Sequence, residues 1–429
     1  MNPRDLLVES FQAAIAAVHP LRIVPPHLPN PPRGKTLVIG AGKAAAAMAA
    51  AVEAGWPADA PLLGLVITRY GHGMLTRRIR VVEAGHPLPD ENGETAAREI
   101  LTAVHALGPD DLLLALFSGG GSSLLALPVN GVAMAELKQI TSDLLRSGAT
   151  IQEINTVRKH LSLIQGGRLV AACRAPVLAL IISDVTGDEA THIASGPCAP
   201  DPGTYADAVA VLQRYAITPP ASVMRVLEEG VAGMRTETPK PGDARFARVE
   251  NRVIATAGEM LSAARAFFEQ RGISASVVDD AVTGEACEVA KIHAELVREL
   301  GGSHHPWLAP LALPPLVLLS GGECTVTVRG KGRGGRCSEF LLALALELDG
   351  MPHVYALAAD TDGIDGLADN AGAYLQPDSI ARAGSMRLDA AALLGNNDAY
   401  SFFEAVDGLL VTGPTRTNVN DYRVIYLAQ

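Results

Sequence analysis

The stretch Asp111-Leu-Leu-Leu-Ala-Leu-Phe-Ser-Gly-Gly-Gly-Ser-Ser123 decides the fold class of this chain. Its apolar run, Leu112 to Phe117, predicts a strand buried on both faces, as in a parallel sheet. Open α/β sheets bind ligands at the carboxyl ends of their strands, and glycines let backbone N–H groups approach a phosphate. A phosphate-binding loop and a tight strand-to-helix turn explain the next residues equally well: Ser118, Gly119, Gly120, Gly121, Ser122 and Ser123.

Length and composition limit the classes of protein to consider. A chain of 429 residues is long enough for two domains, or three on length alone. The net charge of -11 argues against non-specific nucleic-acid binding, which needs a basic surface. Five cysteines without a C-x-x-C pair indicate neither a zinc site nor a disulfide framework, so we expect a reducing, cytoplasmic location. The amino terminus predicts an amphipathic helix to about Val18, and no apolar run reaches the ~20 residues that span a bilayer, so we expect a soluble protein.

A second predicted strand end also carries glycines. Thr36 to Gly40 reads as a short buried strand, and the residues from Gly40 to Ala45 have the G-x-G-x-x-A spacing of a dinucleotide turn. Lys43 lies at the start of the following helix, where a cation opposes the helix dipole at a cost of about 0.3–1 kcal/mol unless an anion offsets it. A bound phosphate or carboxylate would be that anion, and a solvated lysine is the alternative.

Acidic residues follow two other predicted strands. Asp184 and Asp188 come after the apolar run that starts at Pro176, and Asp360 comes after the strand from His353 to Ala359. Carboxylates at strand ends are well placed to hold Mg²⁺ directly or through water. Aspartates that cap a turn are an equally good explanation. The segment at Asp360 resembles the start of an EF-hand loop, but the glutamate at the twelfth loop position and the preceding helix are missing, so calcium is excluded.

Cations gather in two further stretches. Arg158 and Lys159 lie in a predicted helical segment, where an anion site and a polar helix face are equally good explanations. Gly330-Lys-Gly-Arg-Gly-Gly-Arg336 interleaves glycines with cations ahead of a helix predicted from about Ser338 to Leu348. This pattern predicts an anion-binding loop, with an exposed basic turn as the alternative.

The chain is predicted to form two α/β domains. A polar, proline-bearing stretch from Met234 to Ala244 predicts a linker, so we expect domains at 1–240 and 245–429. The second domain repeats the pattern of a strand that ends in glycines, and there we expect a similar turn made of Ser320, Gly321, Gly322 and Glu323.

Glycine-rich strand ends, a lysine, an arginine and carboxylates are together the groups that phosphoryl transfer needs. That reaction depends on positioning and on neutralising the charge of the transferred group. The chain has neither the G-x-x-x-x-G-K-[ST] loop nor the protein-kinase motifs. A kinase of another type is therefore indicated.

Together the motifs resemble those of the bacterial glycerate 2-kinase family, over nearly the whole chain. The family usually has Asn-Gln where this chain has Cys337-Ser338. The resemblance implies a Rossmann-like αβα sandwich followed by a second α/β domain with a mixed sheet, including a MOFRL region at about 314–425. It also implies an active site in the cleft between the domains. The matching stretches are Gly40-Ala-Gly-Lys43-Ala, His86-Pro-Leu-Pro-Asp90, Ser118-Gly-Gly-Gly-Ser122, Asn155-Thr-Val-Arg-Lys-His160, Ser183-Asp184-Val-Thr-Gly-Asp188, Ser320-Gly-Gly-Glu323, Gly334-Gly-Arg336 and Asp360-Thr-Asp-Gly-Ile-Asp-Gly366.

The resemblance implies ATP-dependent, Mg²⁺-supported phosphorylation of the 2-hydroxyl of D-glycerate, with Lys43 and Arg336 as the catalytic residues. We expect ATP to be held by residues 118–123 and by Gly321, Gly322 and Glu323. We expect Mg²⁺ to be held by Asp184 with Asp188 or Asp360. The expected partner is the small-molecule substrate, with a homodimer left open.

An NAD(P)H-dependent hydroxypyruvate reductase is the alternative function. Some relatives of the family carry that name, and the glycine spacing from Gly40 to Ala45 is that of a dinucleotide turn. Arg69, at the end of the next predicted strand, could accept a 2′-phosphate. The hypothesis of a reductase therefore remains as an alternative to that of a kinase.

Overall fold

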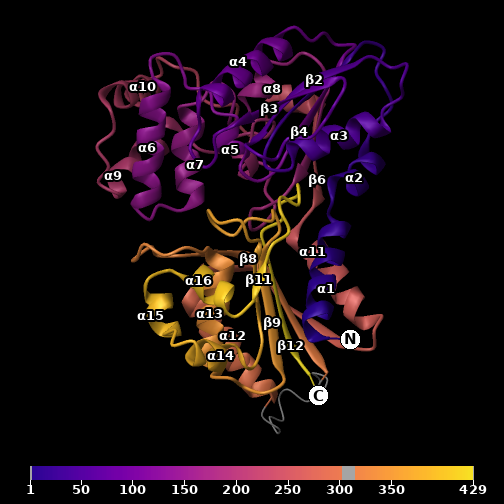
Figure 1. Cartoon of the computed structure of the whole chain (residues 1–429). Helices are drawn as coiled ribbons and strands as arrows, with labels where there is room; N and C mark the ends of the chain where they lie inside the picture. Colours follow the sequence, from indigo (N-terminus) through magenta and orange to yellow (C-terminus); the bar gives the residue numbers. More distant parts are fainter. Residues whose placement is uncertain (1, 302–314, 429) are drawn as a thin grey trace. The chain divides into compact units, whose positions relative to one another are not determined.

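The structure is a computed structural model that describes residues 2–301 and 315–428. It divides into two compact units (Figure 1): a first unit, Pro20–Ile254, and a second unit formed by Met1–His19 together with Ala255–Gln429. Each unit is built on a six-stranded sheet with helices packed against it. The predicted two-domain α/β class is therefore confirmed.

The sheet of the first unit has the doubly wound strand order β3-β2-β1-β4-β5-β6. The pairs from β3 through β5 are parallel. Strands β1, β4 and β5 are buried along their whole length, which explains their nearly continuous apolar sequences. The strands are β1 (Thr36–Ala41), β2 (Leu62–Arg69), β3 (Ile79–Ala84), β4 (Leu112–Phe117), β5 (Val177–Ile182) and β6 (Val249–Ala255).

Helices of the first unit form two groups. One group lies along the sheet and comprises α2 (Pro20–Ile23), α3 (Ala45–Gly55), α4 (Glu91–His105), α5 (Gly121–Leu124) and α8 (Arg168–Ala171). The other group stands together to one side in Figure 1 and has a hydrophobic cluster of its own. It comprises α6 (Met134–Arg146), α7 (Ile151–His160), α9 (Tyr205–Arg214) and α10 (Ala221–Val231).

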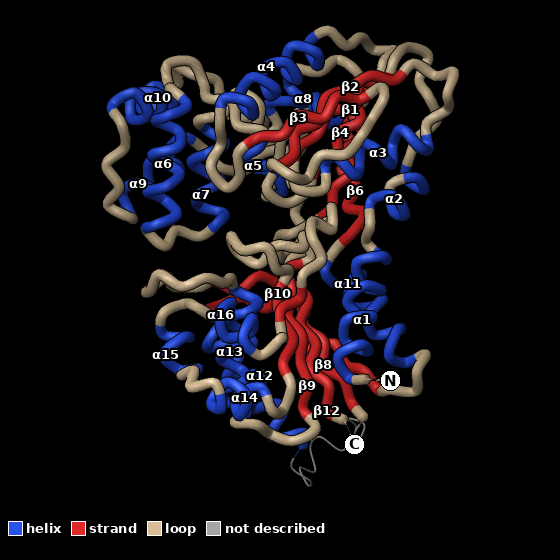
Figure 2. The backbone as a smooth tube through the Cα atoms, in the orientation of Figure 1, coloured by secondary structure: helices blue, strands red, loops and turns tan. Residues whose placement is uncertain are grey.

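The second unit is a three-layer structure around a mixed sheet, as the resemblance implied. Its strand order is β11-β10-β9-β12-β8-β7, and only the β7–β8 pair is parallel. Figure 2 shows α1 and α11 on one face of this sheet and α12 to α16 on the other. The strands are β7 (Ser274–Glu285), β8 (Leu316–Thr325), β9 (Val354–Asp360), β10 (Gly372–Leu375), β11 (Leu409–Leu410) and β12 (Asp421–Leu427). The helices are α1 (Pro3–Ala17), α11 (Ala257–Glu269), α12 (Ala286–Gly301), α13 (Arg336–Leu348), α14 (Ser379–Ser385), α15 (Ala390–Gly395) and α16 (Ala399–Ala405).

The division between the units differs from the expected domains in two ways. The stretch expected as a linker, Met234 to Ala244, lies inside the first unit, because the chain returns to add β6 to the first sheet. The amino-terminal helix α1 belongs to the second unit. There Phe11 packs on Tyr422 with 5.6 Å between ring centroids, and the hydroxyls of Ser10 and Tyr422 are 2.8 Å apart.

The expected glycine turn at Ser320 is not a turn. Ser320 to Glu323 lies inside β8, which continues to Thr325. Gly322 has φ +99° and pairs with Val282 of β7 beside an irregularity in the register. A Cβ atom there would lie 2.3 Å from the backbone nitrogen and oxygen of Val282. The glycine is thus needed for the close approach of two strands, not for a loop.

Substitution of Gly322 with alanine is expected to lower the free energy of unfolding by at least about 2 kcal/mol. Both the left-handed backbone and the clash with β7 oppose a side chain at this position. Gly384→Ala in α14 is the matched control, because nothing lies within 4 Å of its added Cβ, and we expect no loss of stability. Urea unfolding of the two variants measures both effects, and equal midpoints would contradict the close approach.

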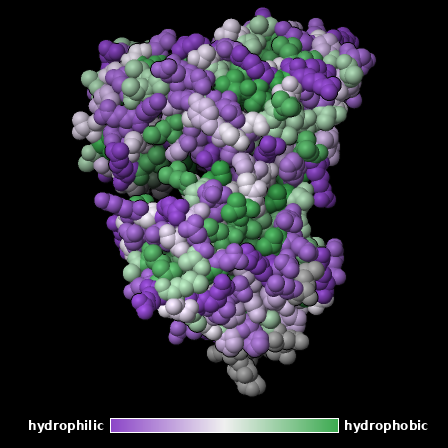
Figure 3. Space-filling view, viewed as in Figure 1, coloured by the Kyte–Doolittle hydropathy of each residue, from purple (hydrophilic) through white to green (hydrophobic). Residues whose placement is uncertain are grey.

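No single helix in the described part of the chain is long and apolar enough to cross a membrane. Two helical segments separated by a bend, Pro3–Ala17 and Pro20–His27, pass that test only when taken together, by length and composition. On the face seen in Figure 3, hydrophobic residues are interspersed with hydrophilic ones.

Candidate active site

The carboxyl ends of β1 and β4 meet where the strand order of the first sheet reverses, since the chain leaves β1 toward β2 and leaves β4 toward β5. The two loops that follow these strands are bonded to each other. The backbone N–H of Lys43 donates to the oxygen of Gly119 at 2.8 Å, and that of Ala44 donates to the Ser118 hydroxyl at 3.0 Å. A Cβ atom on Gly42 would lie 2.1 Å from the Ser118 hydroxyl oxygen. The two predicted glycine segments therefore form one rigid loop pair.

The glycine loop of residues 118–123 presents backbone donors. Among the described residues, the N–H groups of Gly119 and Gly120 donate to no protein acceptor. Gly120 has φ +80°, and a Cβ atom there would lie 2.8 Å from ring atoms of His86 and 3.5 Å from Cγ of Lys43. Open backbone donors beside a lysine suit a phosphate, and the lack of a Cβ leaves the room that it needs. His86 begins one of the stretches that match the family, but its place against this loop was not predicted.

The back of the loop is braced by buried polar side chains that sequence reasoning did not single out. The Ser195 hydroxyl lies 2.8 Å from the Ser122 hydroxyl and donates to Asn155 Oδ1 at 3.0 Å. Ser195 has φ +58°, an uncommon backbone conformation for a residue with a side chain. The amide of Gln165 donates to the backbone oxygen of Ser122 at 2.8 Å. These contacts hold Ser122 and its loop in place. Of the residues involved, Asn155 belongs to a stretch that matched the family.

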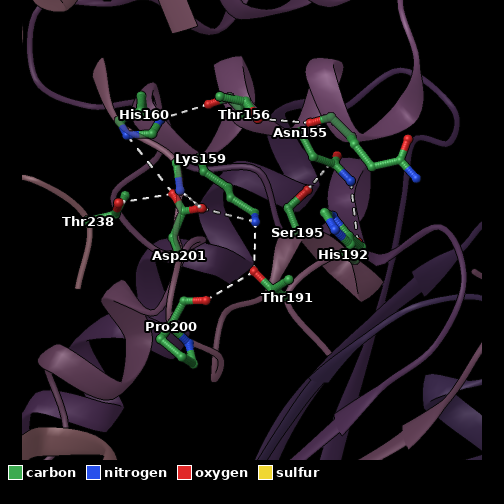
Figure 4. Close-up of polar contacts among 12 residues, drawn as sticks. Asn155, Thr156, Lys159, His160, Thr191, His192, Ser195, Pro200, Asp201 and Thr238 are labelled. Carbon is green, nitrogen blue, oxygen red and sulfur yellow. Dashed lines mark hydrogen bonds and ion pairs between the residues drawn. The ribbon is translucent and has the colours of Figure 1, made fainter. Parts of the chain in front are cut away.

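Lys159 and its neighbours form a second buried network (Figure 4). The Lys159 ammonium lies 3.3 Å from Asp201 and 2.8 Å from the Thr191 hydroxyl, and both charged side chains are 3% exposed. Burial lowers the pKa of Lys159, and the attraction of Asp201 opposes that shift. Because its charge is already paired, Lys159 is a structural residue rather than an anion ligand. Lys159 is also not part of a solvated polar helix face, because it is buried.

His160, beside this network, gives the first unit a pH dependence. Burial lowers the pKa of His160 from its ordinary value of 6.5. The unfolded chain therefore takes up a proton at this histidine near pH 6.5, before the folded chain does, so stability is lost as the pH falls below that value. We expect the free energy of unfolding to fall less between pH 7.5 and 5.5 in His160→Gln than in the wild type. Urea titrations at both pH values measure this, and an equal or steeper loss in the variant would contradict it.

Arg336, the first residue of α13, lies in the second unit and is surrounded by carboxylates. Its three guanidinium nitrogens bond to Asp421 at 2.7 Å, Glu323 at 2.7 Å and Asp360 at 2.8 Å. Burial by itself would lower the pKa of Arg336, but Asp421, Asp360 and Glu323 raise it well above its ordinary value. Arg423 also pairs with Asp421. The arginine is thus held rigidly by acids.

The start of α13 is occupied by a residue of the chain itself. The buried carboxylate of Asp365 accepts the backbone N–H groups of Cys337 at 3.0 Å and Ser338 at 2.8 Å. A Cβ atom on Gly335 would lie 2.2 Å from the same carboxylate. The loop from Gly330 to Arg336 was expected to bind an anion. At the amino-terminal end of α13 that anion is the carboxylate of Asp365. Sequence reasoning missed this because Asp365 is 27 residues or more away along the chain.

Comparison with known proteins agrees with these features. The model of the family described as "Domain of unknown function (DUF4147)" matches residues 6–228, and that of the MOFRL family matches residues 316–421. The D-glycerate 2-kinase of Thermotoga maritima is 39% identical over 423 residues, which cover 97% of each chain. The chain belongs to the glycerate 2-kinase family.

Two further comparisons concern the fold and the function of this glycerate 2-kinase family member. A crystal structure of the glycerate kinase from Thermotoga maritima superposes with a TM-score of 0.85 at 37% identity, covering 99% of each chain. A protein of Agrobacterium vitis, named provisionally as a hydroxypyruvate reductase, is 47% identical and covers 100% of this chain and 95% of its own. The resemblance stated from the motifs is confirmed, and so is the MOFRL region expected at about 314–425.

The expected metal ligands of this glycerate 2-kinase family member are divided between the units. Asp184 and Asp188 follow β5 in the first unit, half-buried and exposed respectively, whereas Asp360 ends β9 in the second unit. In the described ranges, no group of three or more His, Cys, Asp or Glu side chains is arranged to hold a metal ion. Mg²⁺ usually takes one or two carboxylates together with phosphates and water, an arrangement that fits Asp184. The bond from Arg336 does not favour Asp360 as a ligand.

Proposed function

We propose that this protein transfers the γ-phosphoryl group of ATP to the 2-hydroxyl of D-glycerate, giving 2-phosphoglycerate and ADP. The observation that carries the proposal is the loop at residues 118–123. The N–H groups of Gly119 and Gly120 in this loop have no protein acceptor among the described residues, and the loop lies beside Lys43 at the reversal of the strand order. Membership of the glycerate 2-kinase family supports the same reaction.

The chain's own residues have distinct tasks in this proposal. The glycine loop binds phosphate oxygens through backbone donors, and Lys43 neutralises negative charge on the transferred group. Asp184 would hold Mg²⁺, which would screen the charge of the phosphates. Arg336 is proposed to contact the substrate carboxylate or the phosphates. Its three nitrogens each bond an acid, so this contact would replace the bond to Glu323, which is the most exposed of the three acids.

The proposal is tested by measuring ADP release with D-glycerate, L-glycerate, tartronate and hydroxypyruvate, each with ATP and Mg²⁺. We expect turnover with D-glycerate and a product that separates as 2-phosphoglycerate from 3-phosphoglycerate. ADP release with none of the four acids would remove the kinase proposal.

A second candidate is the NAD(P)H-dependent reduction of hydroxypyruvate, which the name of the Agrobacterium vitis relative and the turn from Gly40 to Ala45 favour. In that case the purified protein would oxidise NADPH when hydroxypyruvate is added. We expect no such oxidation. The donors of Gly119 and Gly120 would suit the pyrophosphate of a dinucleotide as well as the phosphates of ATP, so this expectation rests on the match to glycerate 2-kinases.

We propose a cytoplasmic location for the protein. The five cysteines are free in the structure, which is compatible with the reducing cytoplasm that we propose.

A further inference from the structure

A small cavity lies beside the glycine loop, within the first unit. The space in it that admits the centre of a water-sized group is about 20 Å³, room for a group of a few atoms. Ser122 and Ser123 of the loop line one part of it, and Arg158 of α7 lines another. Thr141 and Gln165 add polar groups to the wall. A cation and several hydroxyl groups thus face one cavity at the edge of the proposed phosphate loop.

Arg158 has no acid to balance its charge. Its side chain is half-buried, yet within residues 2–301 and 315–428 it makes no hydrogen bond and no ion pair. Burial lowers the pKa of Arg158 to about 10, and no carboxylate opposes that effect. Lys159, the next residue, is in contrast fully paired with Asp201 and Thr191.

A structural role accounts poorly for Arg158. Arg158 lies in the last turn of α7, where the helix dipole stabilises a cation. That stabilisation is smaller than the free-energy cost of removing the guanidinium from water. Buried cations are normally balanced by acids, as Lys159 is by Asp201 in the same unit. A group whose charge is left unbalanced at a cavity is suited to a ligand of opposite charge.

The chemistry of the cavity points to an oxyanion. The guanidinium of arginine can donate two parallel hydrogen bonds to a carboxylate or a phosphate. The Ser123 hydroxyl already donates to the backbone oxygen of Gly120 at 3.1 Å, and the Ser122 hydroxyl is bonded to that of Ser195, so the donors that the cavity offers to an oxyanion are those of Arg158. Gln165 holds Ser122 by its backbone oxygen, so the loop is already positioned without the ligand.

We propose that Arg158 binds an oxyanion group of a ligand in this cavity, beside the loop serines Ser122 and Ser123. The choice between the carboxylate of the hydroxy acid and a phosphate of the nucleotide rests on the proposed function, since both are oxyanions of that reaction.

Isothermal titration of the full chain with D-glycerate, ADP and inorganic phosphate tests the proposal. We expect Arg158→Gln to weaken the binding of at least one of these by about 10- to 100-fold, as for the loss of charge-assisted hydrogen bonds. Arg158→Lys keeps the charge but not the paired donors, so we expect a smaller loss. Arg146→Gln, in the last turn of α6 with a side chain 77% exposed, is the matched control and should bind as the wild type does.

The pattern of losses identifies the ligand. Weakening for D-glycerate alone assigns the subsite to the carboxylate, and weakening for ADP and inorganic phosphate assigns it to a phosphate. Unchanged binding of all three by Arg158→Gln, or by Arg158→Lys if the first variant does not fold, would overturn the proposal, as would a wild type that binds none. Binding that depends on Arg158 without formation of phosphoglycerate would instead leave the subsite standing and refute the proposed function.

Discussion

Replacing Lys43 with alanine is expected to lower kcat/KM for D-glycerate by at least about 10²- to 10³-fold, as for the removal of one charge-stabilising donor from an active site. The fold should be retained, because the bond that joins the two loops comes from the backbone N–H of Lys43 and not from its side chain. Steady-state kinetics with varied ATP and varied D-glycerate measure the loss.

Lys291→Ala is the matched control for this variant. Lys291 lies on the exposed surface of α12 and pairs with Glu288 at 2.7 Å, so its removal should leave kcat/KM unchanged. A Lys43→Ala protein with nearly normal kcat/KM and a normal melting temperature would remove Lys43 from the proposed chemistry.

Replacing Arg336 with alanine is expected to abolish turnover and also to destabilise the second unit. The substitution takes one cation away from Asp360 and Asp421, whose side chains are 4% and 0% exposed, and leaves Arg423 as the cation beside Asp421. Loss of one partner from a buried ion pair typically costs about 3–5 kcal/mol.

Urea unfolding and kinetics separate the two effects at Arg336. Arg336→Lys keeps a charge among the acids, so we expect it to recover much of the stability but little of the activity, since lysine cannot bond to three carboxylates in one plane. Arg298→Ala removes an exposed pair with Glu347 and should change stability by less than about 1 kcal/mol. An Arg336→Ala protein as stable as the wild type would contradict the buried cluster.

The first sheet could be predicted from the sequence because buried parallel strands have a simple signature. The apolar run from Leu112 to Phe117 has the same bounds as β4, and its glycine loop lies where the pattern indicated. The strand before Lys43 was recovered in the same way. The position of the loop pair then follows from the order of the strands.

Other features depend on partners that are distant along the chain. The pair Gly321-Gly322 has the sequence of a turn. Glycine is needed at 322 because β7 approaches β8 there, and no local pattern reveals that approach. The helix that starts at Pro3 has a clear apolar face, but nothing in its sequence says that Tyr422 covers it. Arg158 and Lys159 were equivalent as sequence, and only the place of Asp201 separates them.

Phosphorus NMR of the wild-type protein with ATP, Mg²⁺ and D-glycerate tests the central claim most directly. We expect the γ-phosphate signal of ATP to decline while the signal of a phosphate ester on carbon 2 of glycerate grows by an equal amount. Release of the γ-phosphate only as inorganic phosphate, or an unchanged ATP spectrum, would contradict it.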